Sequence, residues 1–372
     1  MNNSKWATTV QRLLERADVR IDGDRPWDLK VHNPQLFRRV LAQGSLGLGE
    51  AYMDGWWDCD RLDQFFERIL RCRIDRQVVS TRDKFRLVWA RLTNSGRRAL
   101  AFHIGRHHYD LGNRLYGAML DRRMIYSGGY WANVQNLEEA QEAKLDLICR
   151  KLDPKPGMKV LDIGCGWGGT ARFLARRYGV SVVGITVSAE QAAEARRRCE
   201  GLPVEILMQD YRDLKGTFDR VVSVGMIEHV GVKNYPTFFD AVRRHLVDDG
   251  LFVLQTIGSN RSGVNTDAWI DRYIFPNSML PSARQLSQAS EPLFILEDWH
   301  SFGPDYDRTL MAWHENVVRR WPELQDLYDQ RFYRMWRYYL LACAGCFRAR
   351  QIQLWQIVYS PSGVVGGYIA PR

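Results

Sequence analysis

The chain has 372 residues, of which 45% are hydrophobic, and it carries a formal net charge of +9. This length suggests two domains, or one large domain with an extension, and the composition is that of a globular protein with a real core. No run approaches the roughly 18 uncharged apolar residues of a membrane span. Residues 1–6 lack the apolar region of an export signal, so export is not expected.

The positive charge calls for an anionic partner, either nucleic acid or an acidic membrane surface. The 13 tryptophans fit both alternatives. Trp beside basic residues suits the headgroup depth of a membrane, and the same pairing can stack on bases. Composition alone leaves the partner open.

The cysteines are scattered and odd in number, which argues for a reducing compartment. Cys343 and Cys346 form a C-x-x-C sequence, but no second pair completes a zinc site. We therefore favour two thiols on a packed helix over a metal or redox centre. The seven cysteines are Cys59, Cys72, Cys149, Cys165, Cys199, Cys343 and Cys346.

The first part of the chain mixes short helices and strands and ends near residue 100, where we place a domain boundary. Its Trp56–Trp57 pair is interpreted as core packing of a small domain. The predicted elements are a helix at 10–14, strands at 19–21 and 29–31, and a helix at 61–70, where apolar residues recur at helical spacing.

Residues 71–98 are strongly basic, and apolar side chains such as Trp89 and Leu92 lie between the arginines. A basic amphipathic segment of this kind can lie in a membrane interface. A solvated linker helix explains the pattern equally well, and both interpretations stay open.

The stretch at residues 160–169 is the one around which the second part is organised. Apolar residues lead into a glycine run and then into a helical pattern at 170–178, as where a buried strand stops at a tight turn. Glycine lets the backbone bend and approach a ligand closely. A strand, loop and helix of this kind form a ligand site in many α/β enzymes.

Gly164, Gly166 and Gly169 also satisfy the dinucleotide pattern G-x-G-x-x-G. That pattern expects an acid about 20 residues on, at the end of the second strand. Here that strand ends in Thr186. Asp162, two residues before the first glycine, suits a loop that holds the amino-acid part of S-adenosylmethionine. We favour a methyltransferase over a dinucleotide enzyme and over a merely structural turn.

Strands and helices alternate after the glycine loop, which predicts a parallel sheet with ligands outside the carboxyl ends of its strands. Thr186, Asp210, Tyr211 and Glu228 all fall at such ends. Residues 258–292 lack clear periodicity and are predicted to form a lid or substrate insertion. The predicted helices are 137–152, 189–199, 235–246, 310–321 and 324–350, and the strands are 181–186, 204–208, 220–224, 251–257, 294–299 and 352–359.

Together these pieces resemble the cyclopropane-fatty-acyl-phospholipid synthase family over almost the whole chain. The resemblance is to its bacterial phospholipid-acting branch, which carries an N-terminal domain that the mycolic-acid branch lacks. It implies an α/β, class I (Rossmann-like) methyltransferase domain at 101–372 and a smaller mixed α+β domain at 1–100 that binds lipid or membrane, with the basic linker. The matching segments are 44–50, 55–57, 108–111, 160–169, 186–188, 228–231 and 305–310.

The resemblance implies methylene transfer from S-adenosylmethionine to a cis double bond of a membrane phospholipid. In the family the alkene attacks the sulfonium methyl, a carbocation forms, and bound bicarbonate removes a proton as the ring closes. An apolar pocket with anions and aromatic faces suits such a cation. The implied partners are unsaturated phospholipids, an anionic membrane surface and a second copy in a homodimer, with no nucleic acid, at the cytoplasmic side of the inner membrane.

Residue roles are also implied by the resemblance. Tyr109, Tyr126 and Ser127 close over the cofactor, Asp162, Gly164, Cys165 and Gly166 line its methionine side, Thr186 and Gln191 meet the ribose, and Asp210 and Tyr211 flank the adenine. Glu228 and Tyr306 match the acid and phenol of the anion site, and Cys343 matches a cysteine proposed as catalytic.

Two positions depart from the family pattern. Gly128 stands where the family usually has cysteine, and Gln255 stands where it has histidine. Both belong to the anion site, so they bear on the bicarbonate role.

Two other classes remain open at this stage. A nucleic-acid methyltransferase would explain the charge, but such enzymes often carry an Asn/Asp-Pro-Pro-aromatic motif where this chain has residues 225–229. A lipid-binding module without activity is disfavoured by the intact glycine loop.

Overall fold

The computed structural model describes residues 3–74 and 112–372. These residues form two compact units, and neither is a continuous stretch of sequence. The helical unit comprises the described residues of Met1–Thr93 together with Asn265–Pro276 and Asp307–Ile352. The sheet unit comprises the described residues of Asn94–Val264 together with Asn277–Tyr306 and Gln353–Arg372.

The predicted domain boundary near residue 100 lies outside the described residues and stays a prediction. Two later segments, 265–276 and 307–352, belong to the same unit as the N-terminal residues. This grouping was not predictable, because packing between segments far apart in the chain leaves no local pattern in the sequence. The lipid-binding role of residues 1–100 and the catalytic role of 101–372 stay predictions.

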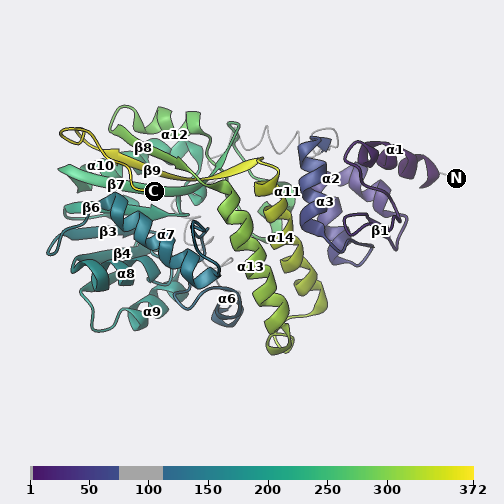
Figure 1. The fold of residues 1–372 in the computed structure, drawn as a ribbon, viewed down its shortest axis with the longest axis horizontal. Helices are drawn as coiled ribbons and strands as arrows, with labels where there is room; N and C mark the ends of the chain where they lie inside the picture. The colour runs from purple at the N-terminus through teal and green to yellow at the C-terminus, as the bar shows by residue number, and fades with distance from the viewer. Residues whose placement is uncertain (1–2, 75–111) are drawn as a thin grey trace. The chain divides into compact units, whose positions relative to one another are not determined.

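The helical unit is built mainly from helices (Figure 1). A short antiparallel pair of strands, β1 and β2, joins Val31 to Trp57. Its elements are α1 (Asn3–Glu15), β1 (Lys30–Val31), α2 (Leu36–Met53), β2 (Trp57–Asp58), α3 (Leu62–Arg71), α11 (Ala268–Tyr273), the later part of α13 (Gly303–Arg320), η5 (Trp321–Glu323) and α14 (Gln330–Arg348).

Helices α3 and α14 pack closely within this unit. A side chain on Gly345 would come 2.6 Å from Phe66 Cβ and 2.8 Å from the Asp63 carbonyl oxygen, so glycine allows the close approach. Arg348 on α14 pairs with the buried Asp63 on α3 at 2.6 Å. The predicted core role of the Trp56–Trp57 pair is confirmed for Trp57, whose side chain is fully buried, whereas Trp56 is only partly buried.

In the sheet unit, seven of the described strands form one sheet in the order β5-β4-β3-β6-β7-β9-β8. The predicted α/β fold is confirmed. The elements are α6 (Asn113–Met119), α7 (Leu137–Leu152), β3 (Lys159–Ile163), α8 (Gly169–Tyr178), β4 (Ser181–Thr186), α9 (Ala189–Arg198), β5 (Val204–Met208), η2 (Tyr211–Asp213), β6 (Phe218–Val224), η3 (Ile227–His229), η4 (Val232–Asn234), α10 (Tyr235–His245), β7 (Leu246–Ser259), α12 (Ala283–Ser290), β8 (Ile295–Ser301) and β9 (Ile352–Ser360).

The strands from β3 to β7 pair in parallel, as predicted from the alternation of strands and helices. That prediction covered the strands up to 251–257; the last two strands, β8 and β9, pair antiparallel. Helices α11 and α12 lie between β7 and β8, and α13 and α14 lie between β8 and β9, so alternation alone does not set the direction of the last two strands.

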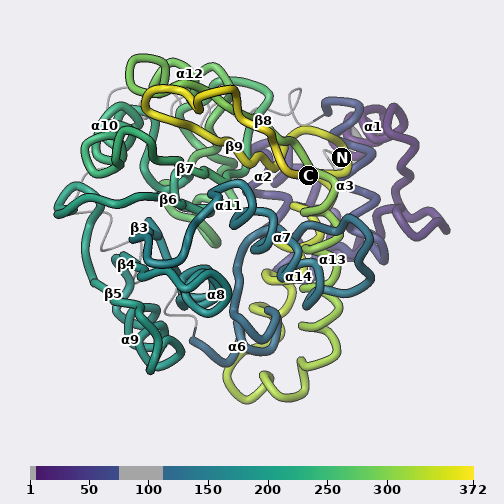
Figure 2. The backbone as a smooth tube through the Cα atoms, turned by 60° about the vertical axis from the view of Figure 1, so that its left-hand side comes forward, coloured from purple at the N-terminus to yellow at the C-terminus, as the bar shows by residue number. Residues whose placement is uncertain are grey.

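Alternating apolar residues cover both faces of this sheet, as period-two side chains require. Leu161 and Phe252 pack on one face with residues of α10 and α12. Val160 and Val253 pack on the other face with residues of α7 and α8. Figures 1 and 2 show these helices on the two sides of the strands. Burial of both faces fixes the strand register and holds the loops at the strand ends.

Most predicted elements exist, and their errors have local causes. The long helix predicted at 324–350 begins only at Gln330, because the Asp329 side chain accepts the Phe332 N–H as an N-cap. The strand predicted at 19–21 is a single bridge between Ile21 and Leu29. The aperiodic region at 258–292 contains α11 and α12. None of the described helices is long and apolar enough to cross a membrane.

Candidate functional site

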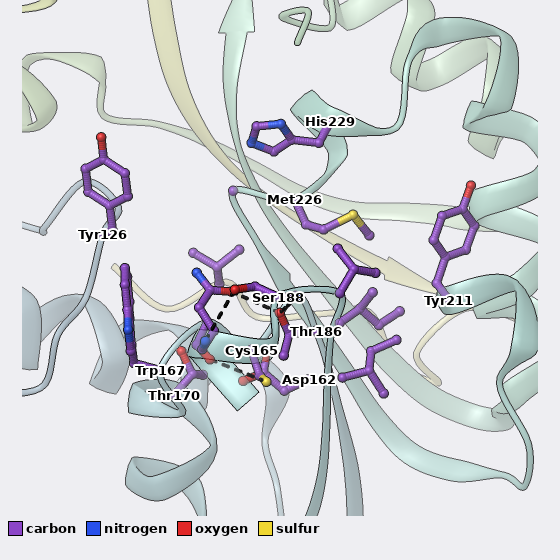
Figure 3. A pocket seen from close by; sticks show the side chains of 18 of the residues that line it. Tyr126, Asp162, Cys165, Trp167, Thr170, Thr186, Ser188, Tyr211, Met226 and His229 are labelled. Carbon is purple, nitrogen blue, oxygen red and sulfur yellow. Dashed lines mark hydrogen bonds between the residues drawn. The ribbon is translucent and has the colours of Figure 1, made fainter. Parts of the chain in front are cut away.

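A pocket in the sheet unit lies at the carboxyl ends of the parallel strands (Figure 3). Parallel strands bring these ends to one edge, so loops from separate strands meet there. Tyr126 and Trp167 lie on one side and Tyr211 on the other. We call it the strand-end pocket. Its walls are Met124, Ile125, Tyr126, Ser127, Asp162, Ile163, Gly164, Cys165, Gly166, Trp167, Gly169, Thr170, Ile185, Thr186, Val187, Ser188, Gln191, Gln209, Asp210, Tyr211, Arg212, Val224, Gly225, Met226, His229 and Val230.

The glycine loop after β3 has a backbone that only glycine adopts readily. Gly164, Gly166 and Gly168 have φ angles of 83°, 54° and 80°. A side chain on Gly164 would also come 2.8 Å from Met226. The N–H groups of Gly164 and Cys165 both donate to the Ile185 carbonyl, at 2.9 and 3.0 Å, which fixes the loop to β4. The loop therefore brings bare backbone and the start of α8 to the pocket.

Asp162 and Lys144 are two buried charged residues behind this loop. Both side chains are almost wholly excluded from solvent. Burial raises the pKa of Asp162 to about 7, and the nearby Lys144 ammonium opposes that shift. Burial likewise lowers the pKa of Lys144 to about 8, opposed by Asp121 and Asp162. Lys144 Nζ donates to Ser127 Oγ at 3.0 Å. Lys144 therefore acts on two residues of the pocket, Ser127 through a hydrogen bond and Asp162 through its charge.

One oxygen of Asp162 is poised for a ligand. Asp162 Oδ2 is buried and accepts no hydrogen bond within residues 3–74 and 112–372. A buried carboxylate oxygen without a donor costs free energy, which a cationic ligand group in the pocket would recover. This atom is the strongest local indication that the pocket takes a positively charged ligand.

Two more hydrogen-bonded groups lie at the ends of β4 and β5. Thr186 Oγ1 donates to Gln191 Oε1 at 2.9 Å, and the Ser188 side chain caps α9. Beyond β5, Arg212 pairs with Asp210 at 2.9 Å. These contacts hold polar side chains in the pocket wall at two separated places.

The structure brings together every predicted cofactor-binding residue that it describes. Tyr126, Ser127, Asp162, Gly164, Cys165, Gly166, Thr186, Gln191, Asp210 and Tyr211 all line the strand-end pocket. Tyr109 lies outside the described residues. Their roles toward a ligand stay predictions.

Sequence reasoning missed several wall residues, among them Trp167, Met226 and His229. Trp167 lies within the glycine loop after β3, and Met226 and His229 follow β6. Their positions after strand ends were a usable signal. Their direction toward the pocket was not, because it depends on the loop conformation. Lys144 was missed because a lysine within an amphipathic helix usually faces solvent.

The predicted anion-site residues Gly128, Gln255 and Tyr306 lie together. A side chain on Gly128 would come 2.9 Å from the Tyr306 ring and 2.7 Å from Leu354. Gln255 Nε2 donates to the Gly128 carbonyl at 3.4 Å, and Gln356 Nε2 donates to Gln255 Oε1 at 2.9 Å. There is no room for a cysteine at 128 beside these side chains, so the first departure from the family pattern fits its surroundings.

Glu228 lies on η3, directly after β6, and it is buried. The Ile257 N–H donates to Glu228 Oε1 at 2.7 Å, two residues along β7 from Gln255. Glu228 Oε2 is buried and has no hydrogen-bond partner within the part of the chain that the structure describes. Burial raises the pKa of Glu228 to about 7. The carboxyl therefore exists in both forms near neutral pH.

Cys343, the remaining predicted catalytic residue, lies on α14 in the helical unit. It is not among the described residues that line the strand-end pocket. Burial raises the pKa of the Cys343 thiol well above its ordinary value, and a protonated thiol is a poor nucleophile. The structure supplies no support for a catalytic role.

A mostly parallel sheet, a glycine loop after its first parallel strand and a strand-end pocket define a Rossmann-like α/β enzyme. The buried acid before the loop, and the absence of an acid at the end of β4, favour an S-adenosylmethionine-dependent methyltransferase within that class.

Residues 97–357 match the family model described as mycolic acid cyclopropane synthetase. The cyclopropane-fatty-acyl-phospholipid synthase of Escherichia coli strain K12 is 57% identical over 371 residues, covering 100% of this chain and 97% of that protein. The chain belongs to the mycolic acid cyclopropane synthetase family.

Solved structures agree with this assignment. The cyclopropane synthase MmaA2 from Mycobacterium tuberculosis matches with a TM-score of 0.66 and 32% identity, over 69% of this chain and 97% of that chain. The mycolic acid cyclopropane synthase CmaA1, solved with SAH and CTAB, matches with a TM-score of 0.66 and 31% identity, over 69% and 97% of the two chains.

Proposed function

We propose that this chain uses S-adenosylmethionine to add a methylene group across the cis double bond of an unsaturated phospholipid acyl chain, giving a cyclopropane ring. Full-length similarity to a synthase of that name supports the substrate class. The observation that carries the cofactor assignment is the unpartnered oxygen of Asp162, in the wall of a pocket beside the glycine loop.

The pocket walls fit S-adenosylmethionine. The Asp162 carboxylate would accept the ammonium of its methionine part, and Lys144 favours the charged form of that carboxylate. Thr186 and Gln191 would meet the ribose, and Asp210 with Tyr211 would flank the adenine. Bound S-adenosylmethionine supplies an electrophilic methyl group. The residues of this chain bind and orient it and exclude water from it.

Gly128, Glu228, Gln255 and Tyr306 form the proposed proton-accepting site. Glu228 Oε2 is free of other described donors, and its carboxyl is partly protonated near pH 7, so it can hold or exchange a proton. Its protonated form, with the amide of Gln255 and the hydroxyl of Tyr306, offers donors to bicarbonate. Bound bicarbonate would supply the base.

Gln255, the second departure, predicts weaker anion binding than in relatives with histidine. Gln255 is neutral, and a neutral hydrogen bond is roughly half as strong as a charge-assisted one. Its Oε1 already accepts from Gln356, which fixes the amide orientation and leaves its N–H₂ group as the donor. An anion would compete with the Gly128 carbonyl for that group.

The proposed partners follow from charge and substrate. The net charge of +9 suits an anionic membrane surface, and an acyl substrate requires contact with the membrane. We include peripheral association with the cytoplasmic side of the inner membrane and a homodimer in this proposal. Sedimentation with and without vesicles measures both.

The test is incubation of the purified chain with labelled S-adenosylmethionine and either unsaturated phospholipid vesicles or RNA. We expect label in lipid only, with each acyl product gaining one CH₂ and losing its double bond, as identified by mass spectrometry. A methylated or methylenated product that keeps a double bond would overturn ring closure. Label in RNA would favour the nucleic-acid class instead.

A further inference from the structure

The charged side chains that line a second pocket of the sheet unit are all arginines. Among the described residues, six arginines and no acidic residue form its wall. We call it the arginine pocket. Its residues are Arg122, Arg123, Trp167, Gly168, Gly169, Arg172, Phe173, Arg176, Arg177 and Arg198.

Three parts of the chain meet at this pocket. Arg172 and Arg176 lie one turn apart on α8, so they share one face of that helix. Arg198 ends α9, which lies beside α8 in both backbone views (Figures 1 and 2). Arg198 Nη1 donates to the Arg122 carbonyl at 3.0 Å, which ties the third segment to α9. The arginines are thus gathered by secondary structure and a specific contact.

Four of the six arginines have acidic partners outside the pocket wall. Arg123 pairs with Glu142 and Glu138, and Arg198 pairs with Glu194 at 2.7 Å. Arg122 and Arg177 make looser pairs, at 3.4 Å or more. These ion pairs orient the side chains and partly offset their charge.

Arg172 and Arg176 have no acidic partner within the described part of the chain. Arg172 Nε is also buried without a hydrogen-bond partner there. Burial, followed by the neighbouring charge of Arg176, lowers the pKa of Arg172, and Arg198 and Arg123 act in the same direction. A bound anion would reduce the repulsion between the Arg172 and Arg176 guanidinium groups and would accept a hydrogen bond from Arg172 Nε. Guanidinium groups are the side chains that best match phosphate oxygens.

The neighbouring apolar residues indicate where such a phosphate would come from. Trp167 and Phe173 lie in the wall with the arginines. Aromatic rings beside basic groups suit headgroup depth in a membrane. Trp167 and Gly169 also line the strand-end pocket, so the two pockets share a wall. A ligand with a phosphate and an acyl chain fits this arrangement better than inorganic phosphate does.

We propose that the arginine pocket binds the phosphate group of a phospholipid headgroup and docks the sheet unit to anionic lipid. This proposal rests on the proposed lipid substrate. It assigns membrane recognition to a site formed by α8, α9 and the residues 122–123.

The test compares two double variants of the full chain that each remove two positive charges. Arg172→Gln with Arg176→Gln alters the arginine pocket and leaves no carboxylate unpaired. Lys215→Gln with Arg284→Gln is the control, because both side chains are exposed in the same unit and neither pairs with an acid among the described residues. Sedimentation measures binding to phosphatidylglycerol and phosphatidylcholine vesicles, and calorimetry measures binding of inorganic phosphate and of S-adenosylmethionine.

We expect the pocket variant to bind phosphatidylglycerol vesicles about tenfold more weakly, and the control to change less than about threefold. S-Adenosylmethionine affinity should stay within about twofold in both, which shows that they are folded. Equal losses in the two variants would mean diffuse attraction and overturn the pocket. Tight binding of inorganic phosphate that the pocket variant loses, with vesicle binding unchanged, would assign the site to a soluble phosphate.

Activity separates this proposal from the proposed function. With the pocket variant, the vesicle concentration for half-maximal turnover should rise while turnover at saturating vesicles stays near that of the native chain. A native chain that makes no cyclopropane would refute the function and leave the vesicle result standing. A fall in maximal turnover with unchanged vesicle binding would overturn the docking role.

Discussion

Glu228 is a carboxyl group whose ionisation is opposed by its burial. Its pKa is raised from 4.5 to about 7, so the stability that it contributes is present below about pH 4.5 and is lost as the pH rises through about 7. Glu228→Gln should therefore gain stability relative to the native chain between pH 5 and 8, by up to about 3 kcal/mol. Urea unfolding at several pH values measures the difference.

The same substitution should cut turnover far more than S-adenosylmethionine affinity, and Tyr306→Phe should act alike. Steady-state kinetics and calorimetry separate the two effects. If either variant lost only cofactor affinity, that residue would leave the proposed proton-accepting site. A pH-independent stability difference would show that Glu228 is ionised throughout.

Lys144 acts on the cofactor site through two residues, Ser127 and Asp162. Lys144→Met should raise the pKa of Asp162 further and weaken S-adenosylmethionine binding by about tenfold, because a neutral carboxyl is a weaker acceptor for ammonium. Lys151→Met is a matched control on the same helix, since Lys151 is equally buried and pairs with Asp298 at 3.2 Å. Both variants should lose stability, but only Lys144→Met should lose affinity. Equal affinity in both would remove Lys144 from this role.

The side chains around residue 128 leave room for glycine and for no larger residue. Gly128→Cys restores the usual family residue, but its Cβ would clash with Tyr306 and Leu354. We expect a loss of about 1–3 kcal/mol in stability and lower turnover. Adding Leu354→Ala makes room and should recover part of the turnover. A fully active single variant would show that the site adjusts freely.

The sequence predicted which residues line the pocket better than it predicted the contacts that those residues make. Asp162 and Thr186 were found because an acid before glycines and a threonine at a strand end are local patterns. The contacts of Gly128 were not predictable, because they come from Tyr306 and Leu354, which lie far along the chain. The burial of Lys144 is likewise a property of tertiary packing.

Helices α3 and α14 approach each other closely at Gly345. Gly345→Ala should destabilise the helical unit by about 1–3 kcal/mol, because the added methyl group would meet Phe66 and the Asp63 carbonyl. Gly117→Ala in α6 is the control, since nothing lies within 4 Å of its added Cβ. That change should be neutral or stabilising by up to about 1 kcal/mol. Thermal unfolding compares them, and equal shifts would contradict the packing argument.

Elements with strong local signals were predicted almost to the residue. Helix α7 has Asn136 as its N-cap and the left-handed Asp153 at its end, and it spans the predicted residues 137–152. The antiparallel pairing of β8 with β9 was missed, because strand direction is set by the path of the chain. The interruption before α14 was missed because apolar residues continue through it.

Charge is a property of the whole molecule. The net charge of +9 predicts that binding to anionic vesicles weakens as salt rises. The reason is that the Debye screening length of the solution falls with salt, to about 10 Å at 0.1 M. Arg82, Arg86 and Arg91 lie outside the described residues, and their joint reversal to glutamate should lower binding and turnover on vesicles. Vesicle sedimentation across a salt series measures both. Salt-independent binding of the native chain would refute the electrostatic part.

The discontinuous helical unit has a consequence for the order of events during synthesis. Asp63 on α3 pairs with Arg348 on α14, 285 positions later. A ribosome releases α3 long before its partner exists, so the first unit begun is among the last completed. The Phe66 side chain, which packs against Tyr338 of α14, lacks this partner until α14 is made. A chaperone that covers Phe66 in that interval would raise the yield of folded chain.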